Sequence, residues 1–368
     1  MLYITTKSLQ RHYTSYSLIH TIKEYSKRKV KPINLKTLLE NSNFTTNNNK
    51  ILRTQYLYKE LPIRLSHRIM ELNELPYNLL KLKSMQNVYN QYIDSFKNLT
   101  DSKYPENIFQ SEEYSNVLSN MLTHHQNINH DIANSLITFN KKNKMNSNLE
   151  RNINVILNRF YTSRLSIRFL TYQHLEIKKS NNSYIGIINK KCNPYNIIED
   201  CIADIKLMSE ITYHKLPIIN FENDINKNIK IIYIDSHIRY IVTEILKNSL
   251  RAAMENNLHF NPISINIQCG KEDLIIKISD KSGGFNRKIL DKVFNFTFTT
   301  GNIEDYMNHQ NKSVIISGYG HGLGLSRIYS RYFGGELKII PFEGVGTDVY
   351  IYLNRLGNKE ENVSDQYF

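Results

Sequence analysis

Four polar residues interrupt an otherwise apolar stretch of the sequence, EILKNSLR at positions 244–251. Glu244, Asn248 and Arg251 are four and three residues apart, so in a helix they share one face, with Lys247 beside them. Such a row commonly forms solvated ion pairs. The same residue types could instead hold a metal-bound polyphosphate, because an amide oxygen can ligate Mg²⁺ and the cations can bind phosphates.

Three later segments carry groups that suit a nucleotide. Asp280 is followed within four residues by Gly283 and Gly284, so a carboxylate can accept a hydrogen bond where the backbone passes close to a flat ring. The stretch GYGHGLGLS (318–326) runs into a helical pattern and offers backbone N–H groups and a helix dipole to phosphate. Thr347 opens the last strand-like segment. The glycine spacing differs from GxGxxG, which disfavours a dinucleotide fold.

Length, charge and cysteine usage exclude several classes of protein. A chain of 368 residues is long enough for two domains with their own cores. The net charge of +13 allows an acidic partner, but no basic run is interleaved with aromatic residues at a stacking spacing, so nucleic-acid binding is disfavoured. No run approaches eighteen apolar residues, so no membrane span is expected. Three cysteines without CxxC spacing favour a reducing compartment.

The N-terminus differs from the rest of the chain. It is rich in hydroxyl and basic side chains and has no acid before Glu24, a composition typical of a mitochondrial transit peptide. We therefore predict a transit peptide over residues 1–23, with a disordered basic tail as the alternative.

The two halves of the chain have different hydrophobic periods. Between Ile51 and His174 four segments have helical spacing, which predicts an antiparallel helix bundle. Two polar stretches, 41–50 and 140–148, are predicted loops. The second half alternates between apolar and polar residues, and its predicted strands are 229–234, 262–268, 273–279 and a hairpin over 336–353, separated by helices at 236–257 and 322–333. The fold class is therefore α+β, with a boundary near 180–190.

In order and spacing, the four polar segments resemble the four-part ATP site of the GHKL superfamily, which includes gyrases, histidine kinases and mitochondrial protein kinases. The resemblance narrows to the mitochondrial 2-oxo acid dehydrogenase kinases, namely pyruvate dehydrogenase kinase and branched-chain 2-oxo acid dehydrogenase kinase. It rests on EILKNSLRAAMEN, ISDKSGGFNRKILDKVFNFTFTT and GYGHGLGLSRIYSRYFGGELKII, and on YKELPIRLSHRIMELNELP and LNRFYTSRLSIRFLTYQH in the first half.

This resemblance covers about residues 24–353 and implies a regulatory four-helix bundle followed by a GHKL α/β sandwich. The implied divisions are the transit peptide at 1–23, the bundle at 24–185, the ATP-binding kinase domain at 186–356 and a short tail at 357–368.

The resemblance also implies roles for individual residues. Glu244 would be the general base for the substrate serine, Asn248 would ligate Mg²⁺, and Lys247 and Arg251 would bind phosphates or brace Glu244. Asp280 would accept the adenine amino group. The remaining implied ATP contacts are Gly284, Thr299, Thr300, Gly318, Tyr319, Gly320, His321, Gly322, Leu323 and Thr347, with a lid over roughly 301–317. The cofactors would be ATP and Mg²⁺, and the family also allows K⁺.

The sequence departs from the family pattern at several positions. Ser282 replaces the first glycine of DxGxG, Gly324 stands where proline is usual, and Tyr240 replaces the histidine of most pyruvate dehydrogenase kinases. The chain has no tryptophan and ends soon after Leu353, so the long Asp-Trp tail used for dimer cross-over is not expected.

The resemblance implies a serine kinase of the mitochondrial matrix that inhibits pyruvate dehydrogenase by phosphorylating the alpha subunit of its decarboxylase component. Tyr240 and the ending VGTDVYIYL leave the branched-chain complex as an alternative target, and Ser282 leaves an inactive nucleotide-binding adaptor. A histidine kinase is disfavoured because His174 is followed by Leu175, and a gyrase because no transducer domain follows. The implied partners are the lipoyl domain of the acyltransferase core and a second kinase chain, identical or paralogous.

Overall fold

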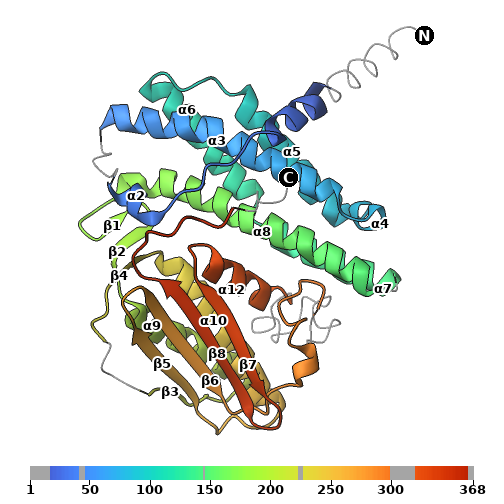
Figure 1. Cartoon of the computed structure of the whole chain (residues 1–368), viewed down its shortest axis with the longest axis vertical. Helices are drawn as coiled ribbons and strands as arrows, with labels where there is room; N and C mark the ends of the chain where they lie inside the picture. The colour runs from blue at the N-terminus through green and yellow to red at the C-terminus, as the bar shows by residue number, and fades with distance from the viewer. Residues whose placement is uncertain (1–16, 41–45, 144–145, 223–226, 299–319, 364–368) are drawn as a thin grey trace.

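The computed structural model describes residues 17–40, 46–143, 146–222, 227–298 and 320–363. A helical layer formed by the first half of the chain lies against an α/β layer formed by the second half (Figure 1). This arrangement confirms the predicted α+β class, with helices before the sheet domain. None of the described helices has the length and apolarity that a bilayer crossing requires.

The helical layer contains the predicted bundle, with one division that the sequence pattern did not indicate. The segment expected as one helix around residues 116–139 is divided at 125–127 into α6 and α7, because Asn127 and its neighbours form a turn there. Helix α3 also begins earlier than predicted, inside the polar 41–50 stretch. The helices are α2 (Leu35–Glu40), α3 (Asn47–Asn73), α4 (Tyr77–Leu80), α5 (Lys83–Asp101), α6 (Ile108–His124), α7 (Ile128–Lys142) and α8 (Ser147–Glu176).

The α/β layer is built on a five-stranded mixed sheet in the order β3-β5-β6-β8-β7. Its strands are β3 (Ile219–Phe221), β5 (Ile263–Cys269), β6 (Asp273–Asp280), β7 (Glu336–Phe342) and β8 (Gly346–Asn354). The helices of this layer, α9 (Pro194–Tyr213), α10 (Asp235–Glu255) and α12 (Gly322–Arg331), lie on one face of the sheet (Figure 1). The two predicted hairpins are confirmed by the antiparallel pairs β5–β6 and β7–β8.

Several elements were not predicted from the sequence, among them strand β3 of the five-stranded sheet. Helix α9 was not predicted, although Pro194 at its start and Asn193, whose side chain caps it, are ordinary helix-start signals. The strands β1 (Tyr184–Ile185) and β2 (Ile188–Cys192) were also missed, and they join the predicted β4 (Ile231–Tyr233) in a separate small sheet. This sheet begins within the predicted boundary region at 180–190.

Part of the predicted transit peptide belongs to the folded body. Residues 17–26 are helical, and Ile22 is only 2% exposed within the hydrophobic core. Tyr25 packs edge-on against Phe96 of α5, with ring centroids 5.4 Å apart. Cleavage after residue 23 would therefore remove a core side chain.

Helix α8 connects the two layers through polar and aromatic contacts. Its Asn154 accepts from the backbone N–H of Phe296 at 2.7 Å and donates to the hydroxyl of Thr297 at 2.8 Å. Two turns further on, the Tyr161 hydroxyl lies 3.1 Å from Nδ1 of His321, just before α12. The imidazole is 4% exposed, and burial lowers the pKa of His321 to about 4.

A second connection is a buried charged network that includes the C-terminal segment. Arg64 of α3 pairs with Glu60 at 3.0 Å and with Glu361 at 2.8 Å, and the guanidinium and the Glu361 carboxylate are fully buried. Glu361 also accepts hydrogen bonds from Ser166 of α8 and from the hydroxyl of Tyr332 after α12. The predicted tail thus contacts both layers. Burial alone lowers the pKa of Arg64, but Glu361 and Glu60 outweigh burial and raise it.

Substitution of Glu361 should therefore destabilise the whole molecule. Glu361→Gln removes one charge from a fully buried pair, so we expect the free energy of unfolding to fall by about 3 kcal/mol. The neighbouring exposed change Glu360→Gln is the matched control and should alter stability by less than about 0.5 kcal/mol. Urea unfolding followed by circular dichroism measures both; equal midpoints for the two variants would refute a stabilising role for the network.

The buried imidazole of His321 should make the molecule sensitive to acid. Because the unfolded chain protonates this residue near pH 6.5 and the folded chain only near pH 4, stability is lost as the pH falls through that window. Between pH 7.5 and pH 5 we expect wild type to lose about 2 kcal/mol more than His321→Gln, which cannot titrate. Other buried histidines contribute equally to both proteins. Parallel stability curves from urea titrations at several pH values would contradict this role.

Candidate functional site: a nucleotide pocket

A pocket of about 320 Å³ lies between α10, the ends of β6 and β8, and the start of α12. It combines a wall of apolar side chains with a few polar groups, as small-molecule sites commonly do. Nine of the residues predicted to bind ATP line it, from all four polar segments: Glu244, Asn248, Arg251, Asp280, Gly284, Gly320, Gly322, Leu323 and Thr347.

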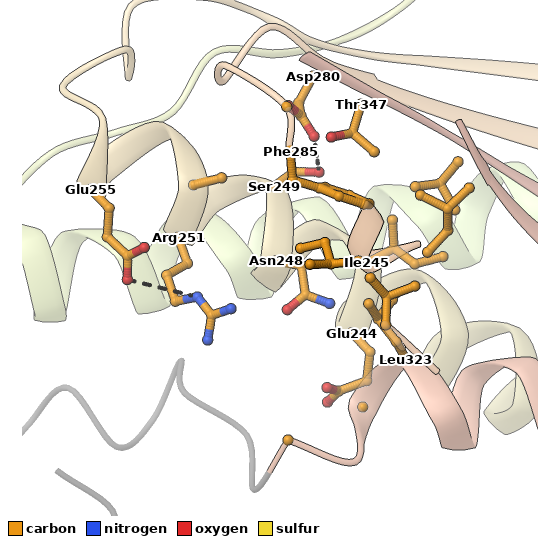
Figure 2. Close-up of a pocket in the computed structure, with 18 of the residues that line it drawn as sticks. Glu244, Ile245, Asn248, Ser249, Arg251, Glu255, Asp280, Phe285, Leu323 and Thr347 are labelled. Carbon is orange, nitrogen blue, oxygen red and sulfur yellow. Dashed lines mark hydrogen bonds and ion pairs between the residues drawn. The ribbon is translucent and has the colours of Figure 1, made fainter. Parts of the chain in front are cut away.

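Asp280 marks one end of the pocket (Figure 2). Its carboxylate is 8% exposed and accepts hydrogen bonds from the Ser249 hydroxyl and from the backbone N–H of Ser282, both at 3.0 Å. Burial raises the pKa of Asp280, although these hydrogen bonds oppose the rise. Thr347 lies directly opposite in the β6–β8 pairing. A buried acceptor fixed in this way suits the amino group of a heterocyclic base.

The loop after Asp280 requires glycine at its third and fourth residues rather than at its second. Gly283 and Gly284 have φ angles of +89° and +61°, whereas Ser282 is not in the left-handed region. A Cβ on Gly284 would lie 2.3 Å from the carbonyl oxygen of Phe342. Ser282 is buried, and its carbonyl accepts from Asn256 at 2.8 Å. The departure from DxGxG is therefore accommodated without backbone strain.

Glu244 lies at the opposite end of the pocket, next to Leu323 at the start of α12 (Figure 2). Its carboxylate accepts from Nζ of Lys247 at 2.7 Å, and both side chains are mostly buried. A Cβ on Gly322 would lie 2.3 Å from Oε2 of Glu244, so any larger residue there would displace this carboxylate. The backbone N–H groups of a helix start are suited to phosphate oxygens.

Asn248 and Arg251 complete the polar row on α10. The Asn248 amide lies between Glu244 and Asp280 in the pocket (Figure 2). Arg251 points to Glu255, with Nε 3.8 Å from the carboxylate, rather than to Glu244. Of the two cations predicted near Glu244, Lys247 is the one that contacts it. Among the described residues no cluster of His, Cys, Asp and Glu could hold a metal alone, so a cation here would need phosphate oxygens beside Asn248.

The structure places the other predicted residues outside the pocket lining. The Lys247 side chain reaches Glu244, and the His321 imidazole faces Tyr161 of α8 instead of the cavity. Thr299, Thr300, Gly318, Tyr319 and the predicted lid lie outside the described residues.

Several lining residues were missed by sequence reasoning. Ser249 holds Asp280, and its position beside Asn248 was the only signal for it. The apolar wall was not predicted because its members come from separate elements and carry no shared spacing. These residues are Ile245, Ala252, Phe285, Ile289, Val293, Phe298, Ile339 and Val349.

Comparison with known proteins agrees with this geometry. Residues 234–356 match the family model "Histidine kinase-, DNA gyrase B-, and HSP90-like ATPase", which includes every described pocket residue, so the domain binds ATP. Residues 32–189 match the model "Mitochondrial branched-chain alpha-ketoacid dehydrogenase kinase".

Similar full-length proteins extend this result over nearly the whole chain. Mouse mitochondrial pyruvate dehydrogenase (acetyl-transferring) kinase isozyme 3 is 33% identical over 92% of this chain and 84% of its own length. The Arabidopsis thaliana mitochondrial pyruvate dehydrogenase (acetyl-transferring) kinase is 32% identical over 94% and 96%. Human isozyme 1 is 31% identical over 82% and 72%. The chain therefore belongs to the family of mitochondrial 2-oxo acid dehydrogenase kinases, whose ATP-binding domain is of the GHKL type.

Proposed function

We propose that this protein is an ATP-dependent serine kinase that phosphorylates the alpha subunit of the pyruvate dehydrogenase decarboxylase component and so inhibits the complex. The observation that carries the proposal is the order of groups along one pocket. A buried acceptor, Asp280, lies at one end, the Asn248 amide in the middle and the Glu244 carboxylate at the other end, beside the start of α12.

This order suits a bound nucleotide. With its base at Asp280 and Thr347, ATP would direct its phosphates past Asn248 toward Gly322 and Glu244. Mg²⁺ would be held by phosphate oxygens and Asn248 and would neutralise charge during transfer. Glu244 would orient the serine hydroxyl and accept its proton, while Lys247 holds that carboxylate in place. Of the predicted residues outside the described part, we retain Thr299, Thr300, Gly318 and Tyr319 as proposed nucleotide contacts.

Membership of this family supports proposals on location, domain division, docking and a bound ion. The names of the relatives support a mitochondrial location, and we propose the matrix. We propose the regulatory bundle at 24–185, the kinase domain at 186–356 and docking on the lipoyl domain of the acyltransferase core. K⁺ beside the phosphates is a further proposal from family membership.

A dimer is also part of the proposal. The sheet face away from α9 and α10 carries the exposed side chains of Ile340 and Phe342 and the half-buried, stacked pair Tyr350–Tyr352. Such a face is suited to a second kinase chain, identical or paralogous.

The branched-chain complex remains the second candidate target, since the matching model of the helical half carries that name and Tyr240 stands four residues before Glu244. Incubation of the kinase with labelled ATP, Mg²⁺ and, separately, each decarboxylase alpha subunit decides between them. We expect acid-stable phosphoserine on the pyruvate dehydrogenase subunit. Label on the branched-chain subunit alone would reassign the substrate, and ATP binding without transfer to either would favour the adaptor.

Glu244→Gln should separate nucleotide binding from transfer. Loss of the carboxylate that accepts the serine proton should lower the transfer rate about 10²- to 10⁴-fold, while the affinity for ATP changes little. Glu255→Gln, at the rim of the same pocket and on the same helix, is the matched control and should keep transfer within about twofold. Equal rates for the two variants would remove Glu244 from the mechanism.

Asp280→Asn should affect binding instead. The amide presents the wrong polar group to the base amino group and leaves it unpaired, so the dissociation constant for ATP should rise about 10- to 100-fold. Asp348→Asn, on the neighbouring strand and paired with Lys277 at 2.9 Å, should leave it unchanged. Fluorescence titration with a labelled ATP analogue measures both; an unchanged constant in Asp280→Asn would exclude the proposed base orientation.

A further inference from the structure

A second cavity, of about 600 Å³, lies between the two layers and shares no lining residue with the nucleotide pocket. One wall is a face of α8, the opposite wall is a face of α12, and the turn at 291–295 and Asn362 close it. Among the residues that the structure describes, its lining contains four arginines, Arg151, Arg159, Arg327 and Arg331, one carboxylate, Asp291, and no lysine.

The two arginines of α12 are held in position. Glu336 accepts from Nε of Arg327 and from Nε and Nη2 of Arg331, at 2.6 to 3.0 Å. Burial alone raises the pKa of Glu336, but these hydrogen bonds outweigh it and lower the pKa to about 2, so the carboxylate stays charged. The Arg327 guanidinium also lies 4.4 Å from the centre of the Phe294 ring. The remaining N–H groups of both side chains are thus pre-organised at the cavity.

The α8 wall supplies a third guanidinium, that of Arg159. Nη1 of Arg159 lies 3.7 Å from the carboxylate of Glu74, which is about half exposed and therefore contributes little. Cations outnumber carboxylates at the cavity even when Glu336 and Glu74 are counted. Guanidinium groups bind carboxylate and phosphate oxygens through paired hydrogen bonds, and opposite walls with this chemistry suit an anion with charged groups at both ends.

We propose that this cavity, which we call the arginine cleft, binds a small polyanion with at least two phosphate or carboxylate groups, bridging Arg159 on α8 and Arg327 and Arg331 on α12. The volume is within the range of sites for metabolite-sized ligands. The ligand would join the helical layer to the ATP-binding layer.

The cleft is physically connected to the nucleotide pocket. The turn that supplies Asp291 and Phe294 to the cleft supplies Val293 to the pocket, and Phe298, three residues after this turn, also lines the pocket. Gly324 lines the cleft and is two residues from Gly322, which lies beside Glu244. A Cβ on Gly324 would lie 2.8 Å from the carbonyl oxygen of Phe294. Because these elements pack without spare room, occupation of the cleft should change nucleotide affinity, and the nucleotide should change polyanion affinity by the same factor.

Isothermal titration of the full chain, with the nucleotide pocket filled by excess ADP and Mg²⁺, tests the proposal. Fructose 1,6-bisphosphate and propane-1,2,3-tricarboxylate are the probes, and their relative affinities distinguish a phosphate from a carboxylate ligand. We expect saturable binding of at least one probe, weakened at least 10-fold by Arg331→Gln and by Arg159→Gln. Asp291→Asn, which removes the one carboxylate found among the described lining residues, should tighten binding about threefold.

Arg239→Gln is the matched control, because Arg239 has the same 41% side-chain exposure as Arg331 and is likewise paired with carboxylates, Asp200 and Asp204, but lies away from the cleft. It should leave binding within twofold of wild type. Absence of saturable binding of both probes, or equal weakening by the control and the cleft variants, would overturn the proposal. The measurement does not require phosphoryl transfer, so its result is independent of the proposed kinase activity.

Discussion

The packing of α10 against the sheet is the constraint on which the nucleotide site depends. Ile238, Ile241 and Ile245 are almost fully buried, and burial of one such side chain contributes about 1.5–3 kcal/mol. These contacts fix the rotation of the helix, so the polar row that begins at Glu244 has to face the pocket. Helix α10 alone therefore positions both Asn248 and Glu244, which favours the positional precision that phosphoryl transfer requires.

The pocket wall formed by α12 and the turn at 291–295 depends on contacts with the helical layer. Helix α12 approaches the Glu244 carboxylate closely at Gly322, which has no side chain, and His321 just before this helix contacts Tyr161 of α8. The turn that lines the pocket is bound to Asn154 of α8. The helical layer thus acts as a support for one wall of the nucleotide site. Changes in the bundle can reach the site through these contacts without a moving segment between them.

The sequence predicted the nucleotide site better than the contacts around it. Short-range spacing placed Glu244, Asn248 and Arg251 on one face, and the alternating pattern placed Asp280 at a strand end. That Thr347 lies opposite Asp280 is seen only in the structure. Long-range packing was not accessible: His321, within the glycine-rich stretch, turns away to a tyrosine 160 residues earlier in the chain. Helix α9 was not predicted, although Pro194 at its start and the capping Asn193 are present in the sequence. Ser282 looked like a defect in the pattern, whereas the backbone angles show that the loop needs glycine only after it.

The buried pair between Arg64 and Glu361 has a consequence for the order of folding. The two residues are separated by 297 positions, so a chain that emerges from a ribosome or a membrane pore with its N-terminus first has the arginine long before its carboxylate partner. Until the last residues arrive, Arg64 has only Glu60 and neutral groups to offset its desolvation. The helical half should therefore reach its final packing only after the ATP-binding half has been completed, and the closing of this long loop is a candidate for the slow step of folding.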